Sequence, residues 1–142
     1  MLETNEVVTC FLESDGKILI LKRSNRVGTY QKKWAGISGY IDNPAKCGVT
    51  DQAYKEIQEE TGLTKYDIEL VKKGATLEVI DSEIKRKWIV HPYLFHIKNK
   101  KEISINWEHL EIKWIYPEEV SLYPTVPKLK EVLRKVSNKI IP

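Results

Sequence analysis

Apolar and β-branched residues gather in short runs bounded by turn-forming residues, which predicts β-strands. Residues 6–12 and 17–22 are two such runs, and Ser14-Asp15-Gly16 between them predicts a β-hairpin. The second run, KILILK, is almost continuously apolar, so we expect both of its faces to be covered by other parts of the protein.

Three later segments have the same character, namely residues 67–80, 88–97 and 112–116. The first of them alternates only in part, which predicts either one bent strand or two short strands. Because Pro92 has no backbone N–H, we expect residues 88–97 to lie at a sheet edge or to carry a bulge there. We also consider a homodimer formed through that edge.

A helical period of 3.6 residues replaces this pattern in two places. Residues 50–62 predict an amphipathic helix, with Thr50 as its N-cap and Gly62 at its end. A second helix is expected within residues 125–138, which place apolar side chains on one face. These side chains are Val126, Leu129, Val132, Leu133 and Val136.

The order of these segments indicates the fold class. Strands precede and follow the central helix without a regular alternation of strand and helix. This order predicts a mixed β-sheet flanked by helices, which is an α/β/α sandwich or α+β fold. At 142 residues, we expect the whole chain, residues 1–142, to form a single domain.

Three acids on the central helix are unusual for their position. Glu56, Glu59 and Glu60 share one sector of the helix and lie near its C-terminal end, where the helix dipole favours cations. Glu56 and Glu60 also lie at the edge of the apolar stripe formed by Ala53 and Ile57, whereas a solvated acidic face would point away from the core. Carboxylates gathered in this way favour a hard divalent cation.

The residues around these acids resemble the Nudix hydrolases. That family carries Gly-x5-Glu-x7-Arg-Glu-hydrophobic-x-Glu-Glu-x-Gly-hydrophobic on a loop, a helix and a second loop. The residues 55–63 match every fixed position except that Lys55 stands for the arginine. The first half departs from the pattern, because Gly39 lies two residues further from Lys55 and no glutamate stands at the upstream position. Asp42, Lys46 and Cys47 occupy that region instead.

The resemblance implies a helix packed on a sheet and an Mg²⁺-dependent hydrolase, with Mn²⁺ as an alternative ion. The expected reaction cleaves a phosphoanhydride in a small-molecule nucleotide or other diphosphate, such as a nucleoside triphosphate or dinucleoside polyphosphate. Glu56, Glu59 and Glu60 match the metal-binding acids, and Glu59 is also a candidate to take a proton from water. Lys55 matches the arginine that orients those acids, although lysine lacks the two-pronged fork of a guanidinium.

Three further residues complete the expected site. Arg23 closes a strand and can reach a phosphate, although a solvated arginine is an equal alternative. The backbone carbonyl of Gly39 is a candidate metal ligand. The resemblance also implies a loop acid before a tryptophan-containing strand, for which Glu108 is preferred over Glu111.

Other functions remain open at this point. The altered segment after Gly39 fits a catalytically weak or inactive Nudix-fold module that binds or regulates through a nucleotide. An isomerase acting on an isoprenyl diphosphate would need a reactive thiol, for which Cys47 is the candidate. The acids could also form an ordinary surface helix. Tyr30, Trp34 and Trp107 could stack on a nucleobase, but core packing is the simpler use of each.

Composition and charge limit the kinds of partner that we expect the protein to bind. The chain is 42% hydrophobic and 30% charged, with a net charge of +3 and no basic cluster long enough to bind a nucleic acid polymer. It has no apolar run of about 18 residues, so we expect no membrane span. The N-terminus does not resemble a signal peptide, so we expect a cytoplasmic protein in which Cys10 and Cys47 are reduced.

Overall fold

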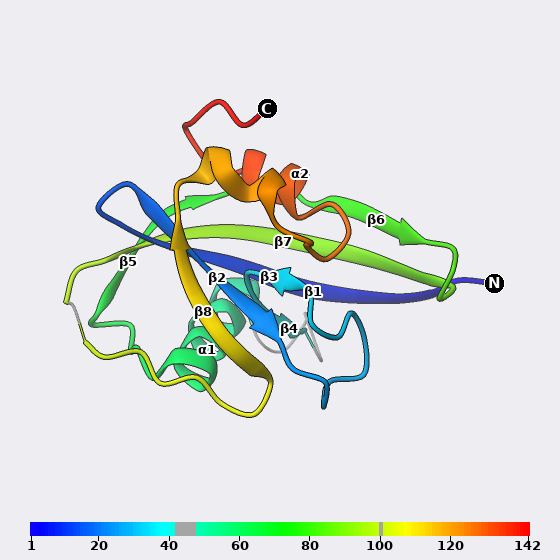
Figure 1. Ribbon diagram of the computed structural model, residues 1–142, viewed down its shortest axis with the longest axis horizontal. Coiled ribbons are helices and arrows are strands. Elements are labelled where there is room, and N and C mark those ends of the chain that lie inside the picture. The colour runs from blue at the N-terminus through cyan, green and yellow to red at the C-terminus, as the bar shows by residue number, and fades with distance from the viewer. Residues whose placement is uncertain (42–47, 100) are drawn as a thin grey trace.

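A mixed β-sheet forms the centre of the molecule (Figure 1). The computed structural model describes residues 1–41, 48–99 and 101–142. Asp42, Lys46 and Cys47, which replace part of the family pattern, lie outside the described residues. The strands are β1 (Glu3–Ser14), β2 (Lys17–Arg23), β3 (Trp34–Ala35), β4 (Ile37–Tyr40), β5 (Ile68–Lys73), β6 (Leu77–Asp81), β7 (Arg86–Ile97) and β8 (His109–Ile115).

The predicted hairpin of β1 and β2 is confirmed, but its strands soon separate. They form antiparallel pairs only beside their turn, where Asp15 and Gly16 have positive φ angles of 53° and 79°. Further along, β2 pairs with β8 and β3, whereas β1 pairs with β4 on one side and runs parallel to β7. The short strands β3 and β4 therefore fill the wedge between β1 and β2.

Helices cover both faces of this sheet, as the sequence predicts for an α/β/α sandwich. Helix α1 (Val49–Thr61) packs on one face, and α2 (Leu129–Arg134) with the 3₁₀ helix η1 (Pro117–Leu122) packs on the other (Figure 1). In KILILK, Ile18 and Ile20 join the core under α2, while Leu19 and Leu21 join the core under α1. Both faces of β2 are therefore buried, as expected.

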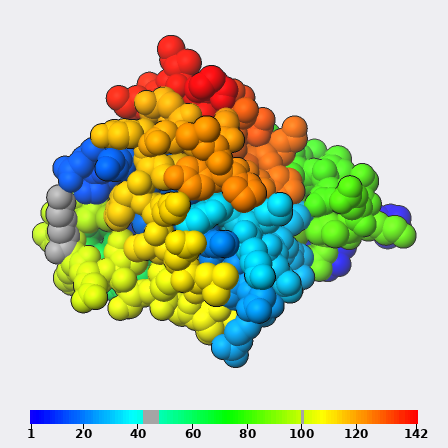
Figure 2. All heavy atoms as spheres, viewed as in Figure 1, coloured from blue at the N-terminus to red at the C-terminus, as the bar shows by residue number. Residues whose placement is uncertain are grey.

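Figure 2 shows how the C-terminal part of the chain, in orange and red, covers one side of the molecule. The helix predicted over residues 125–138 is shorter than expected, because α2 spans only Leu129–Arg134. Thr125 instead forms a bridge with Trp34, and Val126 donates its N–H to the Trp34 carbonyl at 3.0 Å. The extended backbone along β3 therefore delays the start of the helix.

The prediction that Pro92 marks a sheet edge is wrong. Strand β7 lies between β1 on one side and both β5 and β6 on the other. The pairing with β6 ends at Val90 and the pairing with β5 begins at Tyr93, so Pro92 faces the gap where an N–H is not needed. Its carbonyl accepts a hydrogen bond from Gly74 at 2.9 Å. A homodimer stays a prediction, without this edge to support it.

The limits of α1 are partly as predicted. Gly62 has a φ of 82° and ends the helix in the left-handed conformation, as expected. Gly48, and not Thr50, occupies the N-cap position, and the Thr50 hydroxyl lies 2.9 Å from the Tyr93 hydroxyl. The side chain of Thr50 therefore ties α1 to the sheet and does not cap the helix. Across the described ranges, no helix is long and apolar enough to cross a membrane.

A buried aspartate joins the loop after α1 to the loop after β7. The Asp67 carboxylate accepts hydrogen bonds from the Thr64 N–H at 2.8 Å and the Thr64 hydroxyl at 3.0 Å, and it pairs with Lys101 at 3.0 Å. Its backbone carbonyl accepts hydrogen bonds from Lys98 and Asn99. The backbone hydrogen bond from Thr64, followed by that from Lys101, lowers the pKa of Asp67 from 3.8 to about 2.

We expect Asp67→Asn to lower the melting temperature by several degrees at pH 7. Because the folded-state pKa is depressed, the contribution of Asp67 is complete above its ordinary pKa of 3.8 and is lost as pH falls toward 2. The difference in melting temperature between the wild type and Asp67→Asn, measured by thermal unfolding, should therefore become smaller as the pH falls below 5. The exposed Glu69→Gln variant on β5 is the control, and a gap that stays constant with pH would contradict this account.

Candidate active site

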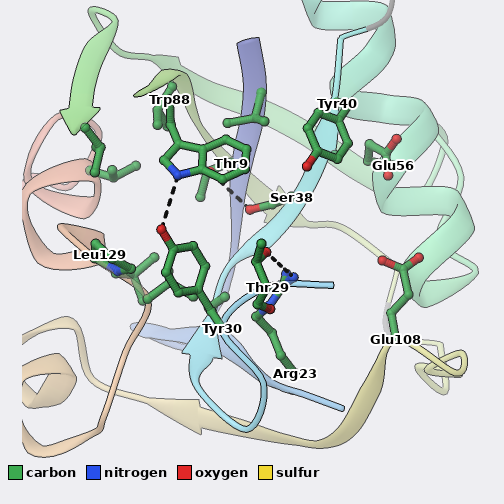
Figure 3. Close-up of a pocket in the computed structure, with 18 of the residues that line it drawn as sticks. Thr9, Arg23, Thr29, Tyr30, Ser38, Tyr40, Glu56, Trp88, Glu108 and Leu129 are labelled. Carbon is green, nitrogen blue, oxygen red and sulfur yellow. Dashed lines mark hydrogen bonds between the residues drawn. The ribbon is translucent and has the colours of Figure 1, made fainter. Parts of the chain in front are cut away.

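The acids of α1 face a pocket of about 440 Å³ between the sheet and the surrounding loops (Figure 3). Its polar side is lined by Arg23, Gly39, Lys55, Glu56, Glu59 and Glu108. Its other side is formed by aromatic and aliphatic residues that include Tyr30, Tyr40, Trp88 and Leu129. The fold therefore brings together six of the seven site residues that the sequence predicts, and the seventh, Glu60, lies behind them.

Strand β4 passes close to α1 at Gly39, so that a side chain at this position would compete with Glu56 for the same space. A Cβ on Gly39 would overlap the carboxyl group of Glu56. Glu56 is half-buried and accepts a hydrogen bond from the Gln52 amide at 2.9 Å. Burial, followed by the nearby charge of Glu59, raises its pKa above the ordinary value. The missing side chain of Gly39 thus creates the space that the Glu56 carboxylate occupies.

Glu60 is the most unusual acid of the site, because its side chain is 1% exposed. Its Oε1 atom lies 3.4 Å from Nε2 of His109, and its Oε2 atom has no hydrogen-bond partner among the described residues. Burial, followed by the charges of Glu108 and Glu56, raises its pKa well above the usual range. A buried carboxylate beside other carboxylates, with one oxygen unpaired, is costly unless a cation or proton joins it.

His109 is a site residue that the sequence analysis did not select. Burial, followed by the charge of Arg23, lowers its pKa from 6.5 to about 4, so the imidazole is neutral near pH 7. Its Nδ1 atom has no partner within the described chain. One feature of the sequence could have pointed to His109, because this residue directly follows Glu108 in the loop that was expected to carry an acid. Its side chain faces Glu60, which only the folded structure shows.

Glu108 enters the pocket from the loop that leads into β8, opposite α1 (Figure 3). Its N–H donates to the side-chain oxygen of Asn106 at 3.0 Å, and its carbonyl accepts the N–H of Ser24 at 2.8 Å. Glu111 does not line this pocket and lies 3.8 Å from Lys22. Of the two candidate loop acids, the structure therefore places the preferred one, Glu108, at the site.

Lys55 and Glu59 occupy the exposed rim of the pocket. Their charged atoms are 4.0 Å apart, and both side chains are more than half exposed. A pair of this kind is worth little in stability, because water screens both charges. Lys55 thus contacts one acid of the helix as a point charge.

Arg23 lies at the end of β2 in the pocket wall. Its Nε atom donates to the Thr29 carbonyl at 3.0 Å, and Nη2 donates to the Thr29 hydroxyl at 3.3 Å. Burial lowers its pKa, and the charges of Glu108 and Glu60 oppose that shift. A guanidinium has five N–H groups, so donors remain after these two bonds for an anion in the pocket.

The aromatic side of the pocket is held by a chain of hydrogen bonds. Trp88 donates its Nε1–H to the Tyr30 hydroxyl at 3.2 Å (Figure 3). Tyr30 in turn donates its hydroxyl hydrogen to Asp81 at 2.8 Å. Tyr40 lies with its ring centroid 6.0 Å from that of Trp88. The sequence suggested Tyr30 for this role but missed Trp88 and Tyr40, which look like ordinary strand residues.

The other two tryptophans suggested as stacking residues have different environments. Trp34 is 5% exposed and packs in the core with Tyr123, as its simpler interpretation predicts. Trp107 is 56% exposed, so core packing does not explain it.

The donor set fits a hard divalent cation. No group of three His, Cys, Asp or Glu side chains is already arranged as a metal-binding cluster in the part of the chain that the structure describes. However, Glu56 and Glu60 carry raised pKa values from burial and mutual repulsion, and Glu60 has an unpaired oxygen. A cation held by these oxygens would offset the repulsion and supply the missing partner.

Comparison with other proteins agrees with this geometry. The family model of the NUDIX domain matches residues 3–136. A MutT protein from Methanosarcina mazei Go1 is 19% identical with a TM-score of 0.76, over 95% of this chain and 94% of that one. A MutT NUDIX hydrolase from Burkholderia pseudomallei is 21% identical with a TM-score of 0.75, over 95% and 99%.

A C. elegans Ap4A hydrolase, solved as a binary complex, is 19% identical with a TM-score of 0.72, over 92% of this chain and 93% of that one. These likenesses establish the fold. A comparison with curated proteins found no match. Because the family model spans nearly the whole sequence, the chain belongs to the Nudix family of pyrophosphohydrolases, which act on acid anhydrides.

Proposed function

We propose that this chain is an Mg²⁺-dependent enzyme, with Mn²⁺ as an alternative ion, that hydrolyses a phosphoanhydride in a nucleoside diphosphate derivative. Its substrate is a nucleoside triphosphate or a dinucleoside polyphosphate. The observation that carries this proposal is the buried, partly unpaired carboxylate of Glu60 behind a pocket lined by further acids. We further propose that residues 1–142 act as one domain in the cytoplasm.

The residues that would hold the cation are Glu56, Glu60 and Glu108. Glu56 and Glu60 project from α1, and Glu108 approaches from the opposite loop. The metal, when bound, neutralises phosphate charge and lowers the pKa of a coordinated water. Glu59 is either a further ligand or the group that accepts the proton of that water. Its position on the solvent-facing rim, beside Lys55, suits a group that must pass its proton to solvent.

In the reaction, the oxygen of water forms a bond to one phosphorus while the bond from that phosphorus to the bridging oxygen breaks. The leaving phosphate keeps the electron pair, and the water proton goes to Glu59 if that residue is not itself a metal ligand. Arg23 binds a phosphate oxygen through the N–H groups that Thr29 does not use, and holds the anion against the acids. The Tyr30, Tyr40 and Trp88 side of the pocket receives the nucleoside.

The departures from the family pattern have local explanations in this proposal. Glu108 takes over the role of the missing upstream glutamate, because it reaches the same pocket from another element. Lys55 faces Glu59 with a single charge in place of the arginine fork. A dinucleoside polyphosphate is included among the substrates because a structural neighbour is an Ap4A hydrolase.

We expect Glu60→Gln to lower Mg²⁺-dependent phosphate release by at least about 100-fold, because the buried metal ligand loses its charge. The same variant should melt at a higher temperature than the wild type without metal, since the repulsion among Glu56, Glu60 and Glu108 falls. Added Mg²⁺ should raise the melting temperature of the wild type but not that of the variant.

The control for this experiment is Glu118→Gln, which changes an exposed acid on η1. It should keep both the activity and the Mg²⁺-induced shift. Retention of most activity in Glu60→Gln would refute the assignment. Absence of turnover in the wild type, with metal-dependent nucleotide binding intact, would instead support the binding-module alternative.

We expect Gly39→Ala to lower kcat/KM by about tenfold or more while the far-ultraviolet circular dichroism stays unchanged. The new methyl group would overlap the Glu56 carboxyl group and displace this metal ligand, which is the far end of a movable side chain. Gly28→Ala is the matched control, because nothing lies within 4 Å of the Cβ position there. Equal activity in the two variants would show that the position of Glu56 is not critical.

A further inference from the structure

Trp107 is exposed in the loop that directly precedes Glu108, and the proposed function does not use it. It is 56% exposed, whereas Trp34 and Trp88 are 5% and 9% exposed. A large aromatic ring left in water on a fixed loop forgoes the stabilisation that burial would provide. Its flat apolar face is available to stack on another ring.

The loop that carries Trp107 is fixed on both sides of it. The Asn106 amide donates to the Glu59 carbonyl of α1 at 3.2 Å, and its side-chain oxygen accepts the Glu108 N–H at 3.0 Å. The Glu108 carbonyl accepts the Ser24 N–H at 2.8 Å. Figure 2 shows these two loops side by side, with residues near 24–28 in blue and residues near 105–110 in yellow. The exposure of Trp107 is therefore imposed by its surroundings.

A cation accompanies this ring. The guanidinium of Arg26 lies 5.8 Å from the centroid of the Trp107 ring, and the Arg26 N–H donates to the Ser24 hydroxyl at 3.2 Å. Arg26 is exposed and forms no ion pair with any acid that the structure describes. An aromatic face beside an uncompensated positive charge suits a ligand that has both a ring and a phosphate.

Trp107 and Arg26 do not line the pocket themselves, but each belongs to a loop that contributes a residue to it. Trp107 directly precedes Glu108, and Arg26 is three residues beyond Arg23; Glu108 and Arg23 both line the pocket. A substrate with one nucleoside on the Trp88 side and its phosphates at Arg23 would extend its far end past Glu108. That end would meet Arg26 and Trp107.

From this arrangement we infer that Arg26 and Trp107 form a second nucleoside subsite. Trp107 stacks on the distal base of a dinucleoside polyphosphate, and Arg26 binds a distal phosphate. The inference rests on the proposed function and selects one substrate class within it. A nucleoside triphosphate reaches only the inner part of this path, and a nucleotide sugar offers no aromatic ring at its far end.

The test compares Trp107→Ala and Trp107→Phe with the wild type on diadenosine tetraphosphate, ATP and ADP-glucose. The measured quantity is the ratio of kcat/KM for the tetraphosphate to that for ATP. We expect Trp107→Ala to lower this ratio about tenfold, the size of one stack between a base and an aromatic ring. Trp107→Phe should restore most of it, and the ADP-glucose to ATP ratio should not change.

A matched control is available on another loop. Tyr66 is 72% exposed, and the amine of Lys65 lies 5.5 Å from its ring centroid, but the loop that carries them contributes no residue to the pocket. Tyr66→Ala should therefore leave the ratio as in the wild type. The inference would be overturned if the ratio of kcat/KM values fell equally in Trp107→Ala and Tyr66→Ala, or if it fell in neither variant.

A second measurement keeps this test independent of turnover. A diadenosine tetraphosphate with methylene groups in place of its bridging oxygens should quench tryptophan fluorescence in the wild type, and much less in Trp107→Phe. If the wild type hydrolyses ATP but the quenching does not depend on Trp107, the inference fails and the proposed function stands. If nothing is hydrolysed but the quenching depends on Trp107, the proposed function fails and the subsite stands.

Discussion

The site depends on one electrostatic constraint, which is that several carboxylates share a space that water cannot fully solvate. Glu60 is buried, Glu56 is half-buried against Gly39, and Glu108 approaches both of them from the opposite loop. Each acid raises the cost of ionising the next one. A fold selected for stability alone would place apolar or neutral groups here, so this cluster indicates that stability has been given up for function.

This arrangement is possible because strands β1 and β2 of the sheet separate beyond their turn. If β1 and β2 stayed paired along their whole length, there would be no room for β3 and β4 between them. The inserted segment carries Gly39 to the acidic helix and Tyr40 to the aromatic side of the pocket. The wedge between two strands of one hairpin therefore determines where the acidic and aromatic sides of the pocket meet.

Local patterns in the sequence were sufficient to predict the hairpin, the covered strand β2 and the acidic helix with its end at Gly62, whereas Glu108 was expected only from the resemblance to the Nudix family. The errors came from tertiary contacts that override local signals. Thr50 is a good capping residue, but its hydroxyl is taken by Tyr93. Pro92 reads as an edge residue, but β7 changes partners at that point. His109 and Trp88 belong to the site only through elements that are distant in sequence, which a periodic pattern does not reveal.

The parallel pair of β1 and β7 has a consequence for how the chain folds. Its register pairs, such as Glu3 with Arg86 and Glu13 with His96, join residues that are 83 positions apart. Ordering such a long loop is entropically costly, and proteins rich in distant contacts fold slowly. During synthesis on the ribosome, β2 and β4 can pair with β1 early, but the edge of β1 that pairs with β7 stays open until β7 has emerged. The N-terminal strand that helps to shape the pocket is therefore also a strand with an exposed edge in the incomplete chain, where pairing with another chain is a hazard.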